Sequence, residues 1–214
     1  MPMNVTNWGR IDFATAWRRQ RELVDAVLFH DEPDTLVFCE HDPVITLGRT
    51  TGEGSVLASS ELLAAQGVNI IEIDRGGEAT VHNPGQLIAY PIFHLERTKP
   101  DLHWFMRTVE QAVIDALQTF GIKAGRVQGL TGVWIDERRK ICAIGVHCRK
   151  WVISHGLALN VNNDLSLFDA IIPCGIRDRG VTSMTRELGA TITPDEVRPV
   201  LEMTMKQNFD VRSK

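Results

Sequence analysis

The sequence predicts an α+β domain in which a mixed, mostly antiparallel sheet packs with helices. Three observations support this class. Strand-like apolar runs recur along the chain, several follow one another without a helix between them, and two long segments carry apolar residues at helical spacing. No repeat, low-complexity tract or linker divides the 214 residues, so we expect a single domain over 1–214.

The first part of the chain alternates between the two kinds of element. Residues 12–30 place apolar side chains at near-helical spacing and predict an amphipathic helix. Residues 34–48 predict two short strands joined by a proline-containing turn. The run 59–67 predicts a short helix that ends at a glycine, and a strand is expected over 68–74.

The later part contains the clearest helix. After a strand-like run at 86–93, residues 101–121 carry one apolar stripe, with a proline before it and a glycine to end it. Three strand-like runs follow within 132–161. A last helix is expected after Thr193, which begins a capping-box spacing, and Pro199 inside that helix favours a kink.

The composition is that of an ordinary globular protein. Hydrophobic residues make up 43% and charged residues 23% of the chain, and the net charge of −4 gives nucleic acid no global attraction. No apolar run approaches the roughly 18 residues of a membrane-spanning helix. The N-terminal residues resemble neither a signal nor a transit peptide. We therefore expect a cytoplasmic protein that binds no nucleic acid and no membrane.

The chain contains four cysteines: Cys39, Cys142, Cys148 and Cys174. A cytosolic location keeps such thiols reduced. Two histidines lie near Cys142 and Cys148, which raises the alternative of a zinc site. The spacing matches no structural zinc pattern, and neighbouring ligands along a strand would point to opposite faces. We expect no bound metal and keep a metal-binding regulatory protein as the weakest alternative.

Three segments are richer in glycine, histidine and cysteine than a core requires. The loop 75–86 contains paired glycines, which let the backbone approach a ligand, but it lacks the spacing of a phosphate-binding P-loop. Lys140 opens a strand, where partial desolvation would turn a lysine into a base and full solvation is the alternative. Cys174 lies between proline and glycine, so its thiol belongs to a turn and is a candidate nucleophile.

Taken together, these segments resemble a known enzyme family. They read, in order, R-G-G-x-x-T-x-H-x-P-G-Q, K-x-x-A-I-G, H-G-L-A-L-N-V and P-C-G, and E-H-D-P-V-I-T-L-G-R precedes them at 40–49. This pattern is similar to that of the lipoate-biosynthesis octanoyltransferases (octanoyl-acyl carrier protein:protein N-octanoyltransferases). Asn83 departs from it, because the family usually has glycine there; asparagine tolerates the left-handed backbone region, so we expect the loop to persist.

The resemblance implies both a fold and a reaction. The fold would be the biotin/lipoate protein ligase catalytic type. The enzyme would transfer octanoyl from octanoyl-acyl carrier protein to a specific lysine of a lipoyl domain, as the first step of endogenous protein lipoylation. Cys174 would carry the acyl thioester, and Lys140 would favour its thiolate form. The acceptors would be lipoyl domains of 2-oxoacid dehydrogenase subunits and the glycine cleavage H protein, and we expect a monomer.

The resemblance also implies a substrate-binding set. It consists of Arg75, Gly76, Gly77, Glu78, Ala79, Thr80, Val81, His82, Ala143, Ile144, Gly145, Gly156, Leu157 and Ala158. We expect His82 and His155 to line the cavity without a defined proton-transfer role. No metal, ATP or organic cofactor is expected, because the incoming thioester is already activated.

A basic stretch provides an expectation about the donor. It contains Arg126, Arg138, Arg139, Lys140, Arg149 and Lys150, against Asp136 and Glu137. Acyl carrier proteins are acidic, so we expect this region to help dock the donor; scattered solvated charge is the alternative.

Two further functions stay open at this point. An ATP-dependent lipoate-protein ligase or an octanoyl amidotransferase is the nearest rival, although a ligase would not need Cys174. A non-catalytic lipoyl-domain-binding module is the other, and the presence of both Cys174 and Lys140 counts against it.

Overall fold

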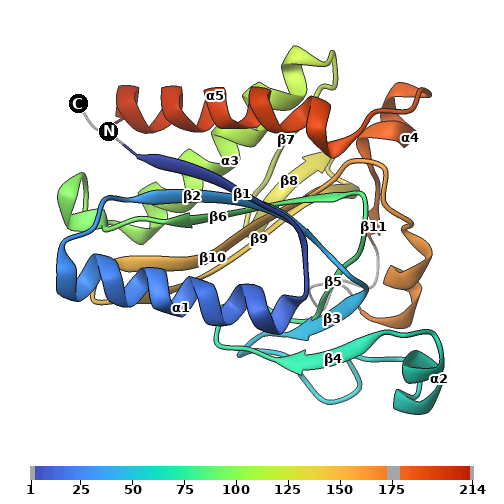
Figure 1. Ribbon diagram of the computed structural model, residues 1–214. Helices are drawn as coiled ribbons and strands as arrows, with labels where there is room; N and C mark the ends of the chain where they lie inside the picture. Colours follow the sequence, from blue (N-terminus) through green and yellow to red (C-terminus); the bar gives the residue numbers. More distant parts are fainter. Residues whose placement is uncertain (1–2, 173–178, 213–214) are drawn as a thin grey trace.

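An eight-stranded sheet forms the centre of the computed structural model, which describes residues 3–172 and 179–212 (Figure 1). Its strand order is β1-β2-β6-β10-β9-β8-β7, and β11 pairs with β9 outside this path. The pairs β1–β2 and β9–β11 are parallel and the others antiparallel, which confirms the mixed, mostly antiparallel sheet. The strands are β1 (Asn4–Ile11), β2 (Thr35–His41), β6 (Gln86–Ile92), β7 (Gly125–Val127), β8 (Leu130–Ile135), β9 (Arg139–Arg149), β10 (Val152–Asn160) and β11 (Gly180–Val181).

A second, smaller sheet lies beside the first (Figure 1). Its order is β4-β3-β5, built from β3 (Val44–Leu47), β4 (Asn69–Glu72) and β5 (Thr80–His82). The two strands expected over 34–48 are present as β2 and β3, but they belong to different sheets. The short helix α2 (Ser60–Ala65) connects β3 to β4. The chain therefore leaves the main sheet after β2 and returns to it at β6. The segment between these two strands includes the loop 73–79.

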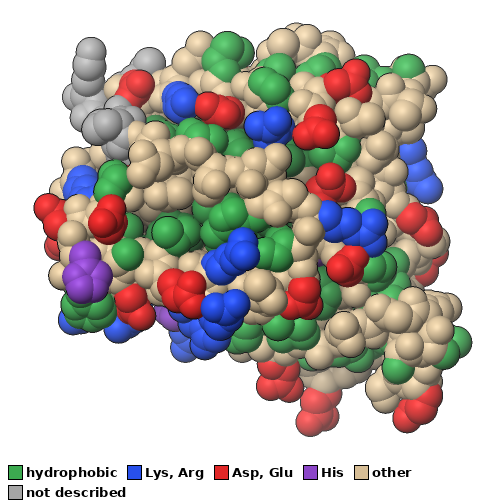
Figure 2. All heavy atoms as spheres, in the orientation of Figure 1, with side chains coloured by type: hydrophobic (Ala, Val, Ile, Leu, Met, Phe, Trp, Pro, Cys, Tyr) green, Lys and Arg blue, Asp and Glu red, His purple; other side chains and the backbone are tan. Residues whose placement is uncertain are grey.

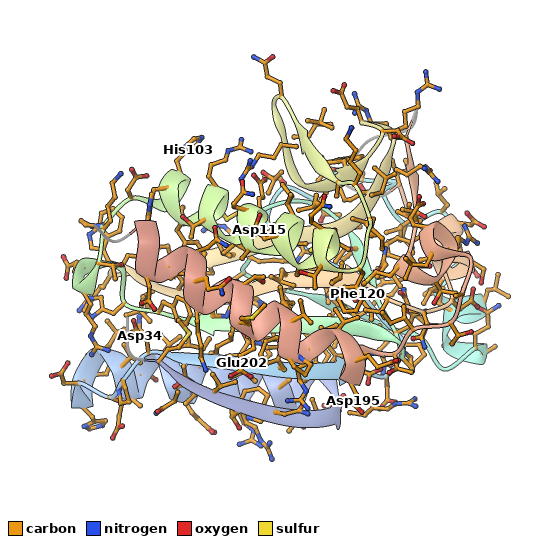
Figure 3. The ribbon with its side chains drawn as sticks, turned by 90° about the horizontal axis from the view of Figure 1, so that it is seen from above. Asp34, His103, Asp115, Phe120, Asp195 and Glu202 are labelled. Carbon is orange, nitrogen blue, oxygen red and sulfur yellow. The ribbon has the colours of Figure 1, made fainter. Side chains whose placement is uncertain are left out.

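Helices cover both faces of the main sheet. Helix α1 (Phe13–His30) packs against β6 and β10, while α3 (Leu102–Thr119) and α5 (Pro194–Arg212) pack on each other over the opposite face (Figure 1). The view from above shows α3 and α5 side by side (Figure 3). Charged side chains of both signs lie over α1 on its outer side (Figure 2), as its amphipathic pattern predicts. The remaining short elements are η1 (Leu95–Arg97), η2 (Ser166–Ala170) and α4 (Met184–Leu188).

Local side-chain chemistry sets where the helices begin. Asp12 and Asp101 cap α1 and α3, and each accepts a hydrogen bond from the backbone N–H three residues on, at 2.8 and 2.9 Å. At α5 the expected capping box is confirmed, because the Thr193 N–H donates to Glu196 Oε2 at 2.8 Å. Each such cap contributes about 1 kcal/mol. Pro199 lies inside α5 as expected.

Strand β9 positions most of the site. It is 11 residues long and forms a hairpin with β10, in which Gly145 lies opposite Gly156. Lys140 lies near its beginning, and Ala143 to Gly145 occupy its middle. The strand thus carries both a candidate catalytic residue and part of the predicted substrate-binding set.

Candidate active site

A cavity opens between the main sheet, the start of α1 and the loop that follows β4. Its empty volume, with the open mouth included, is about 520 Å³. The lining residues are Phe13, Ile73, Arg75, Gly76, Gly77, Glu78, Thr80, His82, Ile88, Tyr90, Ala143, Ile144, Gly145, His155, Gly156, Leu157 and Ala158.

The structure brings the predicted substrate-binding set together around this cavity, with two exceptions. Ala79 and Val81 are fully buried in the core of the small sheet, together with Ile45 and Leu63. Successive side chains of a strand point to opposite faces, so Thr80 and His82 reach the cavity and Val81 points away from it. The structure therefore does not place Ala79 or Val81 in contact with a ligand in the cavity.

The Arg75–Gly77 loop is held by its own backbone and by one arginine. Arg75 Nη2 donates to the Thr46 carbonyl at 3.0 Å and to Thr46 Oγ1 at 2.9 Å. The Gly76 N–H donates to the Val146 carbonyl at 2.9 Å, which ties the loop to β9. A Cβ on Gly145 would lie only 2.9 Å from the Gly76 carbonyl oxygen. Glycine at 145 thus permits this close approach of loop and strand.

The closed end of the cavity contains a buried, neutral histidine. His82 Nδ1 lies 2.8 Å from Gln86 Oε1. The Gln86 amide nitrogen donates to Asn160 Oδ1 at 2.8 Å, so its oxygen accepts and His82 Nδ1 carries the proton. Burial lowers the pKa of His82 to about 3. The imidazole therefore stays neutral at physiological pH and stacks on Phe13, with ring centroids 5.7 Å apart.

A second buried histidine, His41, packs against the rings at this end. His41 Nδ1 lies 2.7 Å from the Ile11 carbonyl oxygen, and its Nε2 lies 2.6 Å from the Tyr90 hydroxyl. Burial lowers the pKa of His41 as well. Its ring packs on Phe13, His82 and Tyr90, so the end of the cavity is closed by rings that carry no charge.

A third histidine connects the loop to the β9–β10 hairpin. His155 Nε2 lies 2.7 Å from Asp74 Oδ1, and His147 Nδ1 lies 2.6 Å from Asp74 Oδ2. The hydrogen bond from His155 is the main cause that holds the pKa of Asp74 well below its usual range. Burial lowers the pKa of His155. The expectation that His82 and His155 line the cavity is confirmed.

Lys140 lies in a second hollow that adjoins the cavity. The two share Gly76, Gly77, Glu78, Ile144 and Gly145. Lys140 is only 7% exposed, which matches the desolvated alternative that the sequence left open. Its Nζ lies over the Trp134 ring, 4.7 Å from the centroid. The arrangement therefore combines a mostly apolar cavity with a nearly buried amine in the adjoining hollow, which is the more open of the two.

Cys174 lies outside the described residues, as do its neighbours from 173 to 178. The chain on either side is placed by backbone hydrogen bonds. The Ile172 N–H donates to the Ser55 carbonyl at 2.8 Å, and Val181 of β11 lies opposite Lys140. The first strand residues described after that gap, Gly180 and Val181, thus pair with Arg139 and Lys140.

The other cysteines differ from a nucleophile in their surroundings. Cys39 and Cys142 are buried, and burial raises the pKa of both thiols well above the usual range. Cys148 is partly buried, and its pKa is also raised by burial. Within the part of the chain that the structure describes, no group of three or more His, Cys, Asp or Glu side chains is placed to hold a metal ion.

Asn83 fits its loop for a different reason from the one expected. Asn83 has no positive φ, whereas Gly85, two residues on, has one at +87°. The Asn83 amide nitrogen donates to the Asp164 carbonyl at 2.7 Å, and its oxygen accepts from Asn163 Nδ2 at 3.0 Å. Asparagine therefore serves here through its side chain, and its tolerance for the left-handed backbone region is not used.

The basic stretch from Arg126 to Lys150 does not form one surface. Strand β9 spans 11 residues, which at about 3.3 Å per residue separates its two ends by about 33 Å. Arg126 pairs with buried Glu110 at 2.9 Å, and Arg139 pairs with Glu187 at 2.7 Å. The strand carries Arg138 and Lys150 to opposite ends, so the whole stretch cannot contact the donor as one patch, and its help in docking the donor stays a prediction.

The fold and site define a family. The model of the lipoyl protein ligase A/B catalytic domain matches residues 12–206, and the chain belongs to this family. It is 47% identical over 203 residues to an octanoyltransferase of Koribacter versatilis, covering 93% of this chain and 81% of the relative. It is 46% identical over 212 residues to an octanoyltransferase of Chloroflexus aggregans, covering 98% and 96%.

Solved structures confirm the fold predicted from the resemblance. A bipartite lipoate protein ligase from Thermoplasma acidophilum, described with its E2 lipoyl domain, matches with a TM-score of 0.75 at 21% identity, covering 97% of this chain and 84% of that one. A biotin protein ligase from Aquifex aeolicus matches with a TM-score of 0.58 at 14% identity, covering 100% and 71%. The chain has the catalytic fold of biotin and lipoate protein ligases. No described helix has the length and apolar character needed to cross a bilayer.

Proposed function

We propose that this protein is an acyltransferase that moves an octanoyl group from octanoyl-acyl carrier protein to a specific lysine of a lipoyl domain. The observation that carries the proposal is the continuity of two hollows. One is an apolar cavity closed by neutral rings, and the other contains the nearly buried Lys140. The octanoyltransferases that resemble this chain at 46–47% identity support the same reaction.

The acyl group would pass through a thioester on Cys174. Lys140 removes the thiol proton, and the resulting thiolate attacks the donor thioester carbonyl. The phosphopantetheine thiolate leaves and takes up that proton from the Lys140 ammonium, so that Lys140 is a neutral amine again before the second step. The amine of the target lysine then attacks the octanoyl-Cys174 carbonyl. An amide forms, the Cys174 thiolate leaves, and Lys140 accepts the proton lost by the amine.

Both tetrahedral intermediates need donors for the oxyanion. The Gly76 N–H already donates to the Val146 carbonyl at 2.9 Å. Because the Gly76 N–H is already used in that bond, the N–H of Gly77, or one close to Gly145, is the better candidate for the oxyanion donor. All of these belong to the rim shared by the two hollows.

The closed end would select the length of the acyl chain. Each buried methylene contributes about 0.8 kcal/mol. A cavity that ends at Phe13, Tyr90 and His82 would therefore bind most tightly an acyl chain that just fills it. A longer chain must displace rings that are themselves packed and hydrogen-bonded. The neutral state of His82 avoids placing a charge against the apolar chain end.

The proposed reaction requires neither ATP nor a metal, because the donor thioester is already activated. Mixing the protein with octanoyl-acyl carrier protein and an apo-lipoyl domain, without ATP and with a chelator present, tests this directly. We expect one octanoyl group on the acceptor lysine. A requirement for free octanoate and ATP would instead identify the ligase alternative, and transfer only from an octanoylated lipoyl protein would identify the amidotransferase.

The proposed partners follow from the same reaction. The donor would be the acyl carrier protein, and the acceptors would be lipoyl domains of 2-oxoacid dehydrogenase subunits and the glycine cleavage H protein. The relative of known structure from Thermoplasma acidophilum is described with an E2 lipoyl domain, which supports the acceptor class. We further propose that the protein acts as a monomer in the cytoplasm.

The donor would dock at the Lys140 end of β9. Arg138 is exposed at that end, and Lys150 is exposed at the other. We expect Arg138→Glu to raise the KM for octanoyl-acyl carrier protein and to flatten its dependence on salt, whereas the matched Lys150→Glu leaves both unchanged. An equal effect of the two reversals would remove the argument for docking at this end.

A further inference from the structure

One residue of strand β10 has a backbone conformation that strands do not normally contain. His155 has φ of +56°, although it pairs with Val146 of β9 inside the hairpin. Residues other than glycine rarely adopt this left-handed region. Where they do, the surrounding structure holds them there, and such residues are frequent at functional sites. The contacts of His155 therefore indicate what its strained backbone is for.

His155 is fixed through both its backbone and its ring. Its N–H donates to Gln20 Oε1 at 2.8 Å, and Gln20 is a fully buried residue of α1. Its ring packs beside Trp17 of the same helix, with centroids 6.1 Å apart. Its Nε2 lies 2.7 Å from Asp74 Oδ1. The helix thus fixes the imidazole, and the imidazole in turn reaches the residue directly before the Arg75–Gly77 loop.

The charges around this contact determine which atom donates. The hydrogen bond from His155 is the main cause that holds the pKa of Asp74 well below its usual range, so the carboxylate is ionised and only accepts. Burial lowers the pKa of His155, Asp74 raises it in part, and Arg75 and His147 lower it further. A neutral His155 therefore donates from Nε2 to an ionised carboxylate, which is a charge-assisted hydrogen bond.

The other histidine on the same carboxylate is held less firmly. His147 Nδ1 lies 2.6 Å from Asp74 Oδ2, but the side chain of His147 is 28% exposed, against 3% for His155. Exposed side chains change rotamer readily. His155 thus provides the fixed point to which Asp74 is attached.

The loop after Asp74 is held on one side by the chain that follows β3. The Arg49 N–H donates to the Arg75 carbonyl at 3.0 Å, and the Thr50 N–H donates to the Gly77 carbonyl at 3.3 Å. A Cβ on Gly48 would collide with the Gly77 carbonyl oxygen, so glycine there permits the close approach. This side uses the acceptors of the loop and leaves its N–H groups for other partners.

The other side of the loop lies against β9, and there one N–H is unused. The Gly76 N–H donates to the Val146 carbonyl at 2.9 Å. Within residues 3–172 and 179–212, the Gly77 N–H makes no hydrogen bond. Gly77 lines both hollows and is three residues from Asp74 along the chain. Its N–H is therefore available to an oxyanion, and the contact between Asp74 and the hairpin lies close to it.

We propose that His155 is a positioning residue that acts through Asp74 to hold the Arg75–Gly77 loop against β9, with the Gly77 N–H at the rim that the two hollows share. The inference rests on the proposed function, in which this rim stabilises the oxyanion of both tetrahedral intermediates. An N–H that is needed only when the oxyanion forms contributes to kcat and not to binding of the donor.

His155→Asn tests the role of the imidazole. Asparagine tolerates the left-handed backbone region, but its shorter side chain gives up the Nε2 contact with Asp74. A loop displacement of about 1 Å can cost about 10²-fold in rate, so we expect kcat for octanoyl transfer to fall by about 10- to 100-fold. The KM for octanoyl-acyl carrier protein should stay within about threefold of wild type. A raised KM with an unchanged kcat would instead show that His155 only shapes the cavity.

Variants of Asp74 test whether His155 acts through the carboxylate. The Asp74 side chain is 40% exposed, so its replacement leaves the core intact. Asp74→Ala should lower kcat as much as His155→Asn does, and Asp74→Asn, which keeps an acceptor oxygen, should lower it less. The double variant Asp74→Ala/His155→Asn should be no slower than the slower single variant, because both remove the same contact. Losses that multiply in the double variant would overturn the positioning role.

His94→Asn is the matched control. His94 also contacts a carboxylate, with Nε2 3.2 Å from Glu96 Oε2, and it is outside the described lining of both hollows. Its kcat should equal that of wild type. A loss as large as that of His155→Asn would attribute the effect to general destabilisation and overturn the inference.

Amide hydrogen exchange separates this inference from the proposed function, because it reports the loop without any substrate. In peptides that contain Gly76, we expect faster exchange in His155→Asn and Asp74→Ala, but not in His94→Asn. Faster exchange in a protein that transfers no octanoyl would refute the proposed function and leave His155 as the residue that holds the loop. Octanoyl transfer with unchanged exchange and unchanged kcat in His155→Asn would leave the function and overturn the positioning role.

Discussion

The two ends of the site use aromatic rings for opposite purposes. At the closed end, Phe13 and Tyr90 pack against His82 and His41, and burial lowers the pKa of both imidazoles so that no charge remains. At the open end, the Trp134 ring lies against a cation that is almost as buried. The comparison shows that one end offers a ligand only uncharged rings, whereas the other end places the Lys140 amine on a ring face.

Removing the cation gives the largest expected effect. Lys140→Met keeps the length of the stem and eliminates the amine, so the rate of octanoyl transfer should fall by about 10²- to 10⁴-fold. Lys150→Met, exposed at the end of β9, is the matched control and should transfer normally. Single-turnover transfer to an apo-lipoyl domain measures both. A Lys140→Met rate within tenfold of wild type would mean that the open end does not depend on charge.

Displacing the loop between the two ends should lower kcat/KM by nearly as much. A Cβ on Gly145 would meet the Gly76 carbonyl at 2.9 Å and Arg75 Cδ at 3.1 Å, so Gly145→Ala pushes the loop away from β9. A displacement of about 1 Å can cost about 10²-fold in rate. Gly125→Ala on β7, where an added Cβ meets nothing within 4 Å, is the control. Comparable kcat/KM values for the two variants would show that the loop can shift without consequence.

Replacing a ring at the closed end by a smaller side chain should change the selectivity for acyl-chain length rather than the rate of transfer. Phe13→Leu opens space beyond the acyl terminus, and each further methylene that fits there contributes about 0.8 kcal/mol, or roughly fourfold in affinity. We expect the ratio of decanoyl to octanoyl transfer to rise by about tenfold. Phe29→Leu on the exposed side of the same helix should leave the ratio unchanged. Competition between the two donors provides the measurement.

The neutral histidine should make stability depend on pH in a defined direction. The pKa of His82 falls from 6.5 to about 3 on folding. Between these values the unfolded chain binds a proton that the folded protein does not, so stability is complete above pH 6.5 and is lost as the pH falls. One such histidine contributes a slope of up to about 1.4 kcal/mol per pH unit.

His82→Gln should reduce that slope, whereas His30→Gln at the exposed end of α1 should not. Urea unfolding at several pH values between 4 and 7 would measure the slope for each variant. Identical slopes in wild type and His82→Gln would contradict the assignment of His82 as a buried neutral ring. This is the smallest of the expected effects, because His41 and His155 also have lowered pKa values and keep part of the dependence.

Local patterns were enough to predict most of the fold. The helix over 101–121 corresponds to α3 (Leu102–Thr119), and the capping box at Thr193 begins α5 as predicted. The separation of β2 and β3 into two sheets could not be seen, because a turn of two residues looks the same whether or not its strands pair. Strand pairing is set by distant partners, which periodicity does not report.

The site was predictable where it consists of contiguous motifs. The loop from Arg75 to His82 reached the cavity as expected, but alternation along β5 turned Val81 away from it. Four residues of the cavity lining were not predicted: Phe13, Ile73, Ile88 and Tyr90. Ile88 and Tyr90 are two residues apart in a strand, so their side chains lie on the same face. Sequence could not show which face borders the cavity. Trp134 was missed because its place opposite Lys140 depends on a β-bulge between β8 and β9, which the sequence pattern does not show.

The central claim is that octanoyl passes through Cys174. The most direct measurement is the intact mass of wild type and Cys174→Ser after incubation with octanoyl-acyl carrier protein, without ATP. We expect one octanoyl adduct on wild type, which hydroxylamine or an apo-lipoyl domain removes and which peptide mapping assigns to Cys174. An absent adduct, or a Cys174→Ser protein that transfers octanoyl at the normal rate, would contradict the thioester pathway.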